Sequence, residues 1–243
     1  MEASPRLVDM TTTAPAETRA AGRRVPLWLE TILLLALALA VSAVVKTFFV
    51  QMFFVPSGSM NPLFVTDDRI LVEKWSYWGD SGVERGDVIV FADPGGSWLG
   101  SLGDAELNPV QSVFARIGLY PTGGHLVKRV IGIGGDRVRC CDTKGRVTVN
   151  GVPLQEKDYI LDGLSPSDRA FDVKVPRERL WVMGDNRTNS EDSRFHQDLE
   201  GGGTIPEDGV VGKVWTIVWP LDRFNVLDRP PTFGNPDLLT SGR

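Results

Sequence analysis

Residues 53–62 read FFVPSGSMNP and follow directly on the only long apolar segment of the 243-residue chain. Pro56 and Pro62 fix φ and lack a backbone donor, and Gly58 permits conformations that are closed to other residues. A stretch of this kind can hold a hydroxyl group in a fixed, exposed position, as a nucleophile requires. The alternative interpretation is an ordinary serine-rich turn that leaves a membrane anchor.

The apolar segment before this stretch runs from Leu27 to Val45 and carries one charge, Glu30. In a helix, this segment is long enough to cross the ~30 Å hydrocarbon core of a bilayer. A cleaved secretory signal that ends near Ala43 is the rival interpretation. We favour a retained anchor, residues 27–49, because a long basic tail precedes the segment and apolar residues continue beyond it.

Basic residues flank the anchor unequally. Lys46 is the one basic residue close behind it, whereas Arg19, Arg23 and Arg24 lie shortly before it. The positive-inside rule therefore predicts a single-pass plasma-membrane protein with a cytoplasmic N-terminus and residues 50–243 outside. Residues 1–26 lack apolar periodicity and are expected to form a disordered cytoplasmic tail.

The composition excludes several classes of protein. A net charge of −5 argues against a nucleic-acid partner. Two histidines and two adjacent cysteines cannot supply a usual zinc site, so no metal and no cofactor are expected. The state of Cys140 and Cys141 is left open, although adjacent strand residues point to opposite faces and a disulfide between them would be strained.

Beyond Pro62 the pattern is mostly period two, which predicts strands. The predicted runs are bounded by Gly, Pro, Asn or Asp and cover residues 70–73, 87–91, 126–131, 137–139, 146–149, 180–183 and 210–219. Asn150-Gly151 is a strong hairpin signal. We predict a mainly β domain over residues 50–228, built from antiparallel sheets or a partly closed barrel.

Two segments depart from the strand pattern. Residues 93–125 are predicted to form an inserted loop with a short helix, because apolar residues recur at helical spacing after Asn108-Pro109. Trp98 in this insertion is expected to lie in a small core under the loop rather than against a membrane. Residues 229–243 are rich in proline and are expected to be a flexible C-terminal tail.

Lys128 lies in the predicted strand 126–131, on the same face as Leu126 and Val130. A lysine on a buried face loses solvation in its charged form, and its pKa can fall from ~10.4 to ~5–6. The neutral amine would then be a general base. The alternative is a solvated face with an ordinary lysine. Arg129 lies on the opposite face, and Arg129→Lys is expected to keep most activity.

A dense polar run, GDNRTNSEDSR, occupies residues 184–194. A solvated loop is the simplest interpretation, and a calcium loop fails because Arg187 stands at a ligand position. The functional interpretation is a supporting group, in which Asp192 pairs with Arg194 and hydroxyls orient a neighbouring amine.

Four ordered blocks resemble bacterial type I signal peptidases, over roughly residues 27–219. The blocks are PSGSM at 56–60, RGDVIVF at 85–91, KRVIG at 128–132 and GDNRxNSxDSR at 184–194. The resemblance implies a membrane-anchored serine endopeptidase with an extracytoplasmic catalytic β domain. Thr188 stands where many members have Asp, which leaves one supporting hydrogen bond in doubt.

The resemblance also assigns roles to residues. Ser59 is the nucleophile and Lys128 is the base, while Ser57 and the backbone N–H of Ser59 form the oxyanion hole. Ser190 hydrogen-bonds the lysine, and Asp192 and Arg194 form a structural ion pair. The implied substrate pockets accept small side chains and are lined by Phe53, Val55, Met60, Leu126 and Val127.

The implied partners are the signal peptides of exported preproteins and membrane lipid, in proximity to the secretion translocon. Two other classes of protein are weighed against this function. A membrane-tethered, non-catalytic β scaffold is favoured only where the serine or the lysine is absent, and both are present. A self-cleaving repressor would carry a DNA-binding domain, for which residues 1–25 are too short.

Overall fold

The computed structural model describes residues 26–77, 82–94, 98 and 124–240. Residues 1–25 of the predicted tail lie outside the described residues, as do the insertion's predicted helix and most of its loop.

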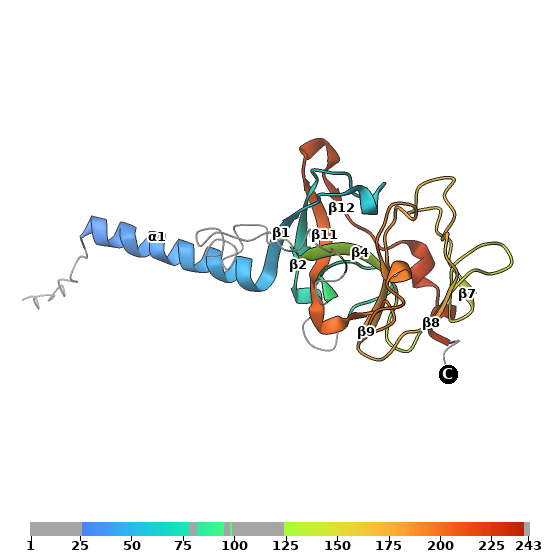
Figure 1. Cartoon of the computed structure of the whole chain (residues 1–243). Coiled ribbons are helices and arrows are strands. Elements are labelled where there is room, and N and C mark those ends of the chain that lie inside the picture. Colours follow the sequence, from blue (N-terminus) through green and yellow to red (C-terminus); the bar gives the residue numbers. More distant parts are fainter. Residues whose placement is uncertain (1–25, 78–81, 95–97, 99–123, 241–243) are drawn as a thin grey trace, which may run out of the picture. The chain divides into compact units, whose positions relative to one another are not determined.

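Helix α1 spans Leu27–Val44, and none of its side chains is buried within the protein. Its Leu and Ala residues favour helix, and eighteen residues extend about 27 Å. Among the described residues, α1 is the one helix that is long and apolar enough to cross a membrane. A π-helical turn, Val45–Phe49, follows α1 and precedes the first strand. Figure 1 shows α1 as one continuous helix.

The described part of residues 41–243 is mainly antiparallel β, which confirms the predicted fold class. Its larger sheet has the order β1-β2-β11-β3-β4-β9-β10, with β12 beside β11. The strands of this sheet are β1 Val50–Phe54, β2 Arg69–Glu73, β3 Val88–Ala92, β4 His125–Gly132, β9 Arg179–Met183, β10 Ile205–Pro206, β11 Val210–Trp219 and β12 Asn225–Val226.

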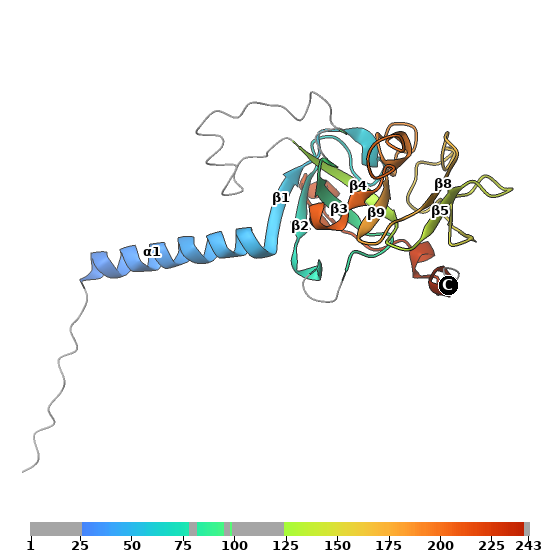
Figure 2. The same ribbon diagram turned by 60° about the horizontal axis from the view of Figure 1, so that its bottom comes forward.

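A smaller sheet has the order β7-β6-β5-β8. Its strands are β5 Arg137–Cys140, β6 Thr148–Val149, β7 Val152–Pro153 and β8 Phe171–Lys174. Asn150 and Gly151 have φ of 55° and 83° and connect β6 to β7, as the hairpin signal predicts. Figure 2 shows β5 and β8 side by side and set apart from β1 and β2.

Three clusters of buried apolar side chains form the core. One is formed by β2, β3 and β11 with the segment that follows β1, and it contains Val55, Met60 and Phe64. A second covers the face of β3, β4 and β9 and contains Leu126 and Val130. The third joins the two sheets, because Ile131, Trp181 and Met183 of the larger sheet pack with residues of the smaller one. Strand β4 is therefore covered on both faces, and its side chains from Lys128 onward are buried.

Residues 231–240 pack against the protein, although the composition of residues 229–243 suggests a flexible tail. Phe233 and Leu238 are buried in the cluster that joins the sheets, and residues 231–234 and 237–240 form short helices. The side chain of Asn150 donates a hydrogen bond to the carbonyl oxygen of Leu238 over 2.9 Å. The prediction was wrong because two isolated apolar residues carry no local period, although each buries its side chain against a distant cluster.

Trp98 is buried, as predicted, and packs in the apolar cluster on the face of β3, β4 and β9. Its ring stacks on His196 with centroids 4.4 Å apart and meets the edge of Phe91 at 5.8 Å. Cys140 and Cys141, whose state the sequence left open, are joined by a disulfide at the end of β5.

Candidate active site

The predicted nucleophile, Ser59, lies in a short 3-10 turn, Gly58–Met60, that follows β1. Ser57 before the turn is extended, with φ −138° and ψ 158°. The chain is fixed on both sides of the turn. Before it, the N–H of Val55 donates a hydrogen bond to the carbonyl oxygen of Asp68, and at its end the Met60 side chain is only 1% exposed. The Ser59 side chain is thereby presented from a fixed backbone.

Lys128 lies in the middle of β4, opposite Ile89 of β3, and is 3% exposed. Its Nζ donates a hydrogen bond to Ser59 Oγ over 2.9 Å. Because Leu126 and Val130 flank it on the same face, the amine approaches the serine through an apolar surface. In its deprotonated form, Nζ could accept the Ser59 proton over the same distance.

Burial lowers the pKa of Lys128 from its ordinary value of 10.5 to about 8. Asp192 and Asp185 oppose this shift, because their negative charges favour the ammonium form. The nearby Arg194 guanidinium acts in the same direction as burial. A substantial fraction of Lys128 is therefore neutral near pH 8, as a general base must be.

The polar run 184–194 is a folded loop that contacts the nucleophile turn. The N–H of Asn186 donates to the carbonyl oxygen of Ser59 over 3.1 Å. Its side-chain amide donates to the carbonyl oxygen of Gly58 over 3.0 Å. The backbone of Gly184 is also close, because a Cβ added there would collide with the Ser59 carbonyl oxygen and with Ser190.

Asp192 and Arg194 form an ion pair that is completely buried, with Arg194 Nη2 2.8 Å from Asp192 Oδ2. The same carboxylate accepts a hydrogen bond from the N–H of Gly184 over 2.9 Å. Burial tends to raise the pKa of Asp192, but the hydrogen bonds and charge of Arg194 prevail and hold that pKa below its ordinary value. The pair therefore stays charged and anchors Gly184 beside Ser59.

Ser190 is buried, but its hydroxyl makes no hydrogen bond with Lys128 or with any other described residue. Its side chain packs against Gly184 instead. Ser57 is exposed, and its Oγ donates a hydrogen bond to Ser59 Oγ over 3.4 Å. The two hydroxyl groups therefore lie next to each other.

The residues predicted to line the substrate pockets separate into two groups. Val55 and Met60 are buried in one cluster, with Phe53 and Val127 packed against it. Leu126 belongs to the neighbouring cluster on the Lys128 face of β4. The ring of Phe53 lies 5.5 Å from that of His125, so β1 and the start of β4 approach each other although they are not neighbours in the sheet.

Two supporting residues were not among the predicted site residues. Asn186 holds the nucleophile turn, as described above. Arg129 makes two hydrogen bonds to Asp185, of 2.8 and 2.6 Å, and both side chains are buried. The signal was present in the polar run and in the KRVIG block, but nothing in the residue spacing reveals which atoms meet.

In the described part of the chain, no group of three or more His, Cys, Asp or Glu side chains is arranged to hold a metal ion. The ring of His196 is covered by Trp98, and its Nε2 makes no hydrogen bond to any described residue. Burial lowers its pKa, so this histidine is neutral at physiological pH.

Known proteins match most of this chain. A probable signal peptidase I of Mycobacterium leprae is 36% identical over 234 residues, covering 83% of this chain and 79% of its own. Signal peptidase I of Mycobacterium tuberculosis is 37% identical over 222 residues, covering 82% and 74%. A solved signal peptidase I of Enterococcus faecalis matches 54% of this chain and 95% of its own at 23% identity, with a TM-score of 0.35.

The family model described as signal peptidase, peptidase S26, matches residues 28–219. That range contains all four sequence blocks, the larger sheet up to the end of β11, and the Ser59–Lys128 contact. This chain therefore belongs to the signal peptidase family of peptidases, peptidase S26.

Proposed function

We propose that this protein is a membrane-anchored serine endopeptidase that removes signal peptides from exported preproteins with a serine/lysine pair. The observation that carries the proposal is the 2.9 Å contact between Ser59 Oγ and the buried Lys128 Nζ. A lysine whose pKa is lowered to about 8 by burial can act as a base, and no ordinary surface lysine can.

In the first half of the reaction, neutral Lys128 takes the proton from Ser59 Oγ as that oxygen attacks the scissile carbonyl carbon. The Ser57 hydroxyl and the backbone N–H of Ser59 donate hydrogen bonds to the resulting oxyanion. When the tetrahedral intermediate collapses, the carbon–nitrogen bond breaks and the Lys128 ammonium returns the proton to the leaving amine. The signal peptide is then held as an ester on Ser59.

In the second half, Lys128 is neutral again and deprotonates a water molecule that attacks the ester. Collapse of the second intermediate breaks the bond to Ser59 Oγ and returns a proton to that oxygen. The products are the free signal peptide and the restored enzyme. Each proton removed is given back by the same amine, so the cycle needs no cofactor.

The strand pairing suggests how a substrate would bind. β9 pairs with β4 only from Arg129 onward, so within the described ranges Leu126 and Val127 have a strand neighbour on one side, β3. β1 ends the larger sheet and pairs with β2 alone. An extended peptide between β1 and β4 could hydrogen-bond to both strands. Its small side chains would then meet Phe53, Val55, Met60, Leu126 and Val127.

Helix α1 would hold the protein in the plasma membrane, where signal peptides emerge near the secretion translocon. Arg19, Arg23 and Arg24 favour an N-terminus in the cytoplasm and residues 50–243 outside. A protease added to intact spheroplasts should then degrade the domain after about residue 50 and spare the N-terminal tail. Protection of the domain would contradict this orientation.

A cleavage assay tests the proposed activity. The full-length protein in detergent should cleave a model preprotein once, and N-terminal sequencing of the product should find the mature N-terminus after small residues at the first and third positions before the cut. Ser59→Ala removes the nucleophile without removing a buried side chain, so it should abolish cleavage while the protein stays folded. Retention of more than a few per cent of wild-type activity would exclude Ser59 as the nucleophile.

A further inference from the structure

Arg187 connects the 184–194 loop to the segment between β7 and β8, and its side chain is only 1% exposed. Each of its three guanidinium nitrogens donates a hydrogen bond. Nε donates to the carbonyl oxygen of Gly184 over 3.0 Å, and Nη1 donates to that of Pro166 over 2.8 Å. Nη2 donates to the carboxylate of Glu156 over 2.6 Å. A buried guanidinium needs a counter-charge, and Glu156 supplies it.

Glu156 lies in the connection between β7 and β8, outside the four sequence blocks that resemble the family. Its side chain is 3% exposed, and its Oε1 also accepts a hydrogen bond from the Tyr159 hydroxyl over 2.8 Å. The backbone N–H groups of Tyr159 and Ile160 donate to the Glu156 carbonyl oxygen, so the carboxylate stands on a closed turn. The turn fixes the place at which Arg187 must sit.

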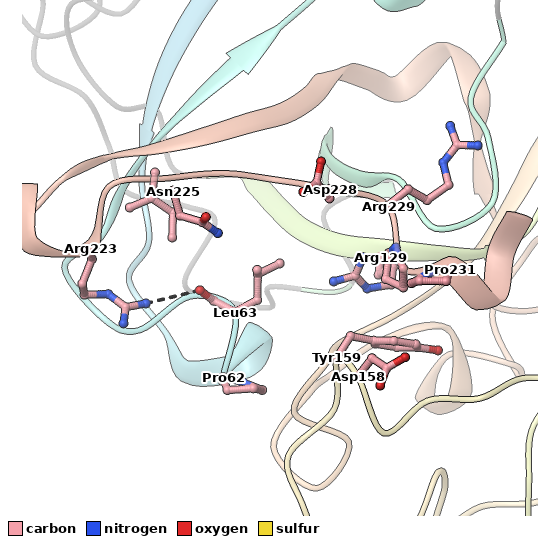
Figure 3. A pocket seen from close by; sticks show the side chains of 12 residues that line it. Pro62, Leu63, Arg129, Asp158, Tyr159, Arg223, Asn225, Asp228, Arg229 and Pro231 are labelled. Carbon is pink, nitrogen blue, oxygen red and sulfur yellow. Dashed lines mark hydrogen bonds between the residues drawn. The ribbon is translucent and has the colours of Figure 1, made fainter.

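Tyr159 extends this connection to β4. The Arg129 guanidinium lies over its ring, 4.8 Å from the centroid, and that of Arg187 lies 5.8 Å from it. Figure 3 shows Tyr159 beside Arg129 in the wall of a pocket of about 470 Å³. Because Arg129 neighbours Lys128 and pairs with Asp185, the turn at 156–160 reaches the flanks of both the base and the 184–194 loop.

The path from Glu156 to the nucleophile is short. Arg187 holds the carbonyl oxygen of Gly184, and Asp192 holds its N–H. Gly184 packs directly on the Ser59 carbonyl oxygen, and Asn186, the residue before Arg187, donates its N–H to the same oxygen. A change in the position of Arg187 must therefore displace the groups that locate Ser59.

We propose that Glu156 is a positioning residue for the Ser59–Lys128 pair and acts through Arg187. The inference rests on the proposed function, because it assumes that this pair performs the reaction. Within the described residues, Glu156 makes no hydrogen bond or ion pair with Ser59, with Lys128 or with the residues predicted to line the substrate pockets. Its loss is therefore expected to reduce kcat and to leave KM nearly unchanged.

Glu156→Gln in the full-length protein is the first test. The amide keeps the size of the side chain but removes the counter-charge, so Arg187 should leave its site and release Gly184. We expect kcat on a model preprotein to fall at least tenfold, with KM within about twofold of wild type. As the loop moves, water reaches Lys128, and the acidic limb of the pH–kcat profile should shift toward higher pH.

Three further variants make the test decisive. Val149→Ala opens a cavity in the cluster that contains Tyr159 but removes none of the Glu156 contacts, and it should lower Tm without moving the acidic limb. Glu156→Asp keeps the charge and should recover part of the lost kcat. Tyr159→Phe removes only the hydroxyl that orients Glu156. It should reduce kcat less than Glu156→Gln does, and it should shift the acidic limb of the pH–kcat profile in the same direction.

The inference is overturned if Glu156→Gln keeps kcat within twofold of wild type, or if its pH profile matches that of Val149→Ala at a similar loss of Tm. If Glu156→Gln fails to fold, Tyr159→Phe becomes the deciding variant. A wild-type kcat together with an unshifted acidic limb of the pH–kcat profile in Tyr159→Phe overturns the inference. Lys128→Ala separates the two proposals. An active Lys128→Ala enzyme refutes the serine/lysine function itself, whereas an inactive one beside a fully active Glu156→Gln refutes only the role of Glu156.

Discussion

The backbone N–H of Asn186 donates a hydrogen bond to the carbonyl oxygen of Ser59 over 3.1 Å. The two members of the proposed serine/lysine pair are therefore supported by different elements. Lys128 is held by the middle of β4, whereas the Ser59 turn is held by the loop that follows β9. Since β4 and β9 are neighbours in the sheet, both supports belong to one hydrogen-bonded framework.

Lys128→Arg should be as inactive as Lys128→Ala, although it keeps the positive charge and most of the length. The pKa of arginine exceeds ~12, so a guanidinium cannot become the neutral base that the proposed mechanism requires. The measurement is the initial rate of preprotein cleavage. Arg129→Lys is not the neutral control that its place on the opposite strand face suggests, because Arg129 is buried and doubly hydrogen-bonded to Asp185.

Arg137→Lys is the better control for that experiment. Arg137 lies on the smaller sheet with its side chain 68% exposed, and its ion pair with Asp172 is at the surface. This variant should keep wild-type activity. Substantial activity in Lys128→Arg would show that residue 128 acts only as a positive charge.

The pH dependence of kcat/KM follows from the state of Lys128. The amine must be neutral to accept the Ser59 proton, and burial lowers its pKa to about 8. Activity should therefore rise about tenfold per pH unit below that value and level off above it. An apparent pKa of ~6.5 for the acidic limb of the kcat/KM profile, the ordinary pKa of histidine, would instead indicate a histidine base.

Lys128→Met should yield a protein that is inactive and more stable than wild type at neutral pH. Below pH 8 both folded and unfolded wild-type chains bind the Lys128 proton, so the folded state bears the full cost of a buried ammonium. The difference between a pKa of 10.5 and one of about 8 corresponds to roughly 3 kcal/mol. The difference in stability between the variant and wild type should narrow between pH 8 and 10.5. In this range the unfolded wild-type chain binds more protons than the folded one, so the stability of the wild-type protein rises with pH.

Thermal unfolding of both proteins across this pH range measures this difference in stability. A Lys128→Met variant with the same Tm as wild type at pH 7 would show that the folded protein already relieves the charge of Lys128. In that case the geometry of the buried amine, rather than its lowered pKa, would have to explain its reactivity.

Gly184→Ala should reduce kcat by about 100-fold, because an added Cβ would collide with the Ser59 carbonyl oxygen and the Ser190 side chain. Gly209→Ala is the matched control, since its Cβ would meet only Pro206 at an ordinary distance of 3.6 Å. Equal single-turnover rates in the two variants would mean that the 184–194 loop does not determine the position of Ser59.

Leu238→Ala should destabilise the protein by about 2–5 kcal/mol, because this side chain is 1% exposed in the cluster that joins the two sheets. Leu199→Ala, at a position that is 41% exposed, should change stability by less than about 0.5 kcal/mol. Denaturant unfolding of the two variants compares them directly. Equal free energies of unfolding in Leu238→Ala and Leu199→Ala would show that the C-terminal segment does not contribute to the core.

Much of the fold could be predicted because the relevant signals are local. The strand alternation, the apolar length of α1 and the Asn150-Gly151 turn each depend on neighbouring residues, so a short window of sequence contains them. Short strands were missed where the window was too brief or already had another interpretation. β8 has four residues, and β1 continues the apolar run of the anchor without a break.

The amino-acid sequence by itself determined the residue types of the site and their order, including a lysine between two apolar neighbours on one strand face. Only the tertiary structure decided which atoms meet, because Ser59 and Lys128 are 69 residues apart and come together through sheet pairing. It also decided that Arg129 and Arg187 are buried, that Glu156 compensates Arg187, and that Leu238 is in the core. Burial depends on what covers a side chain, and the covering residues lie far away along the chain.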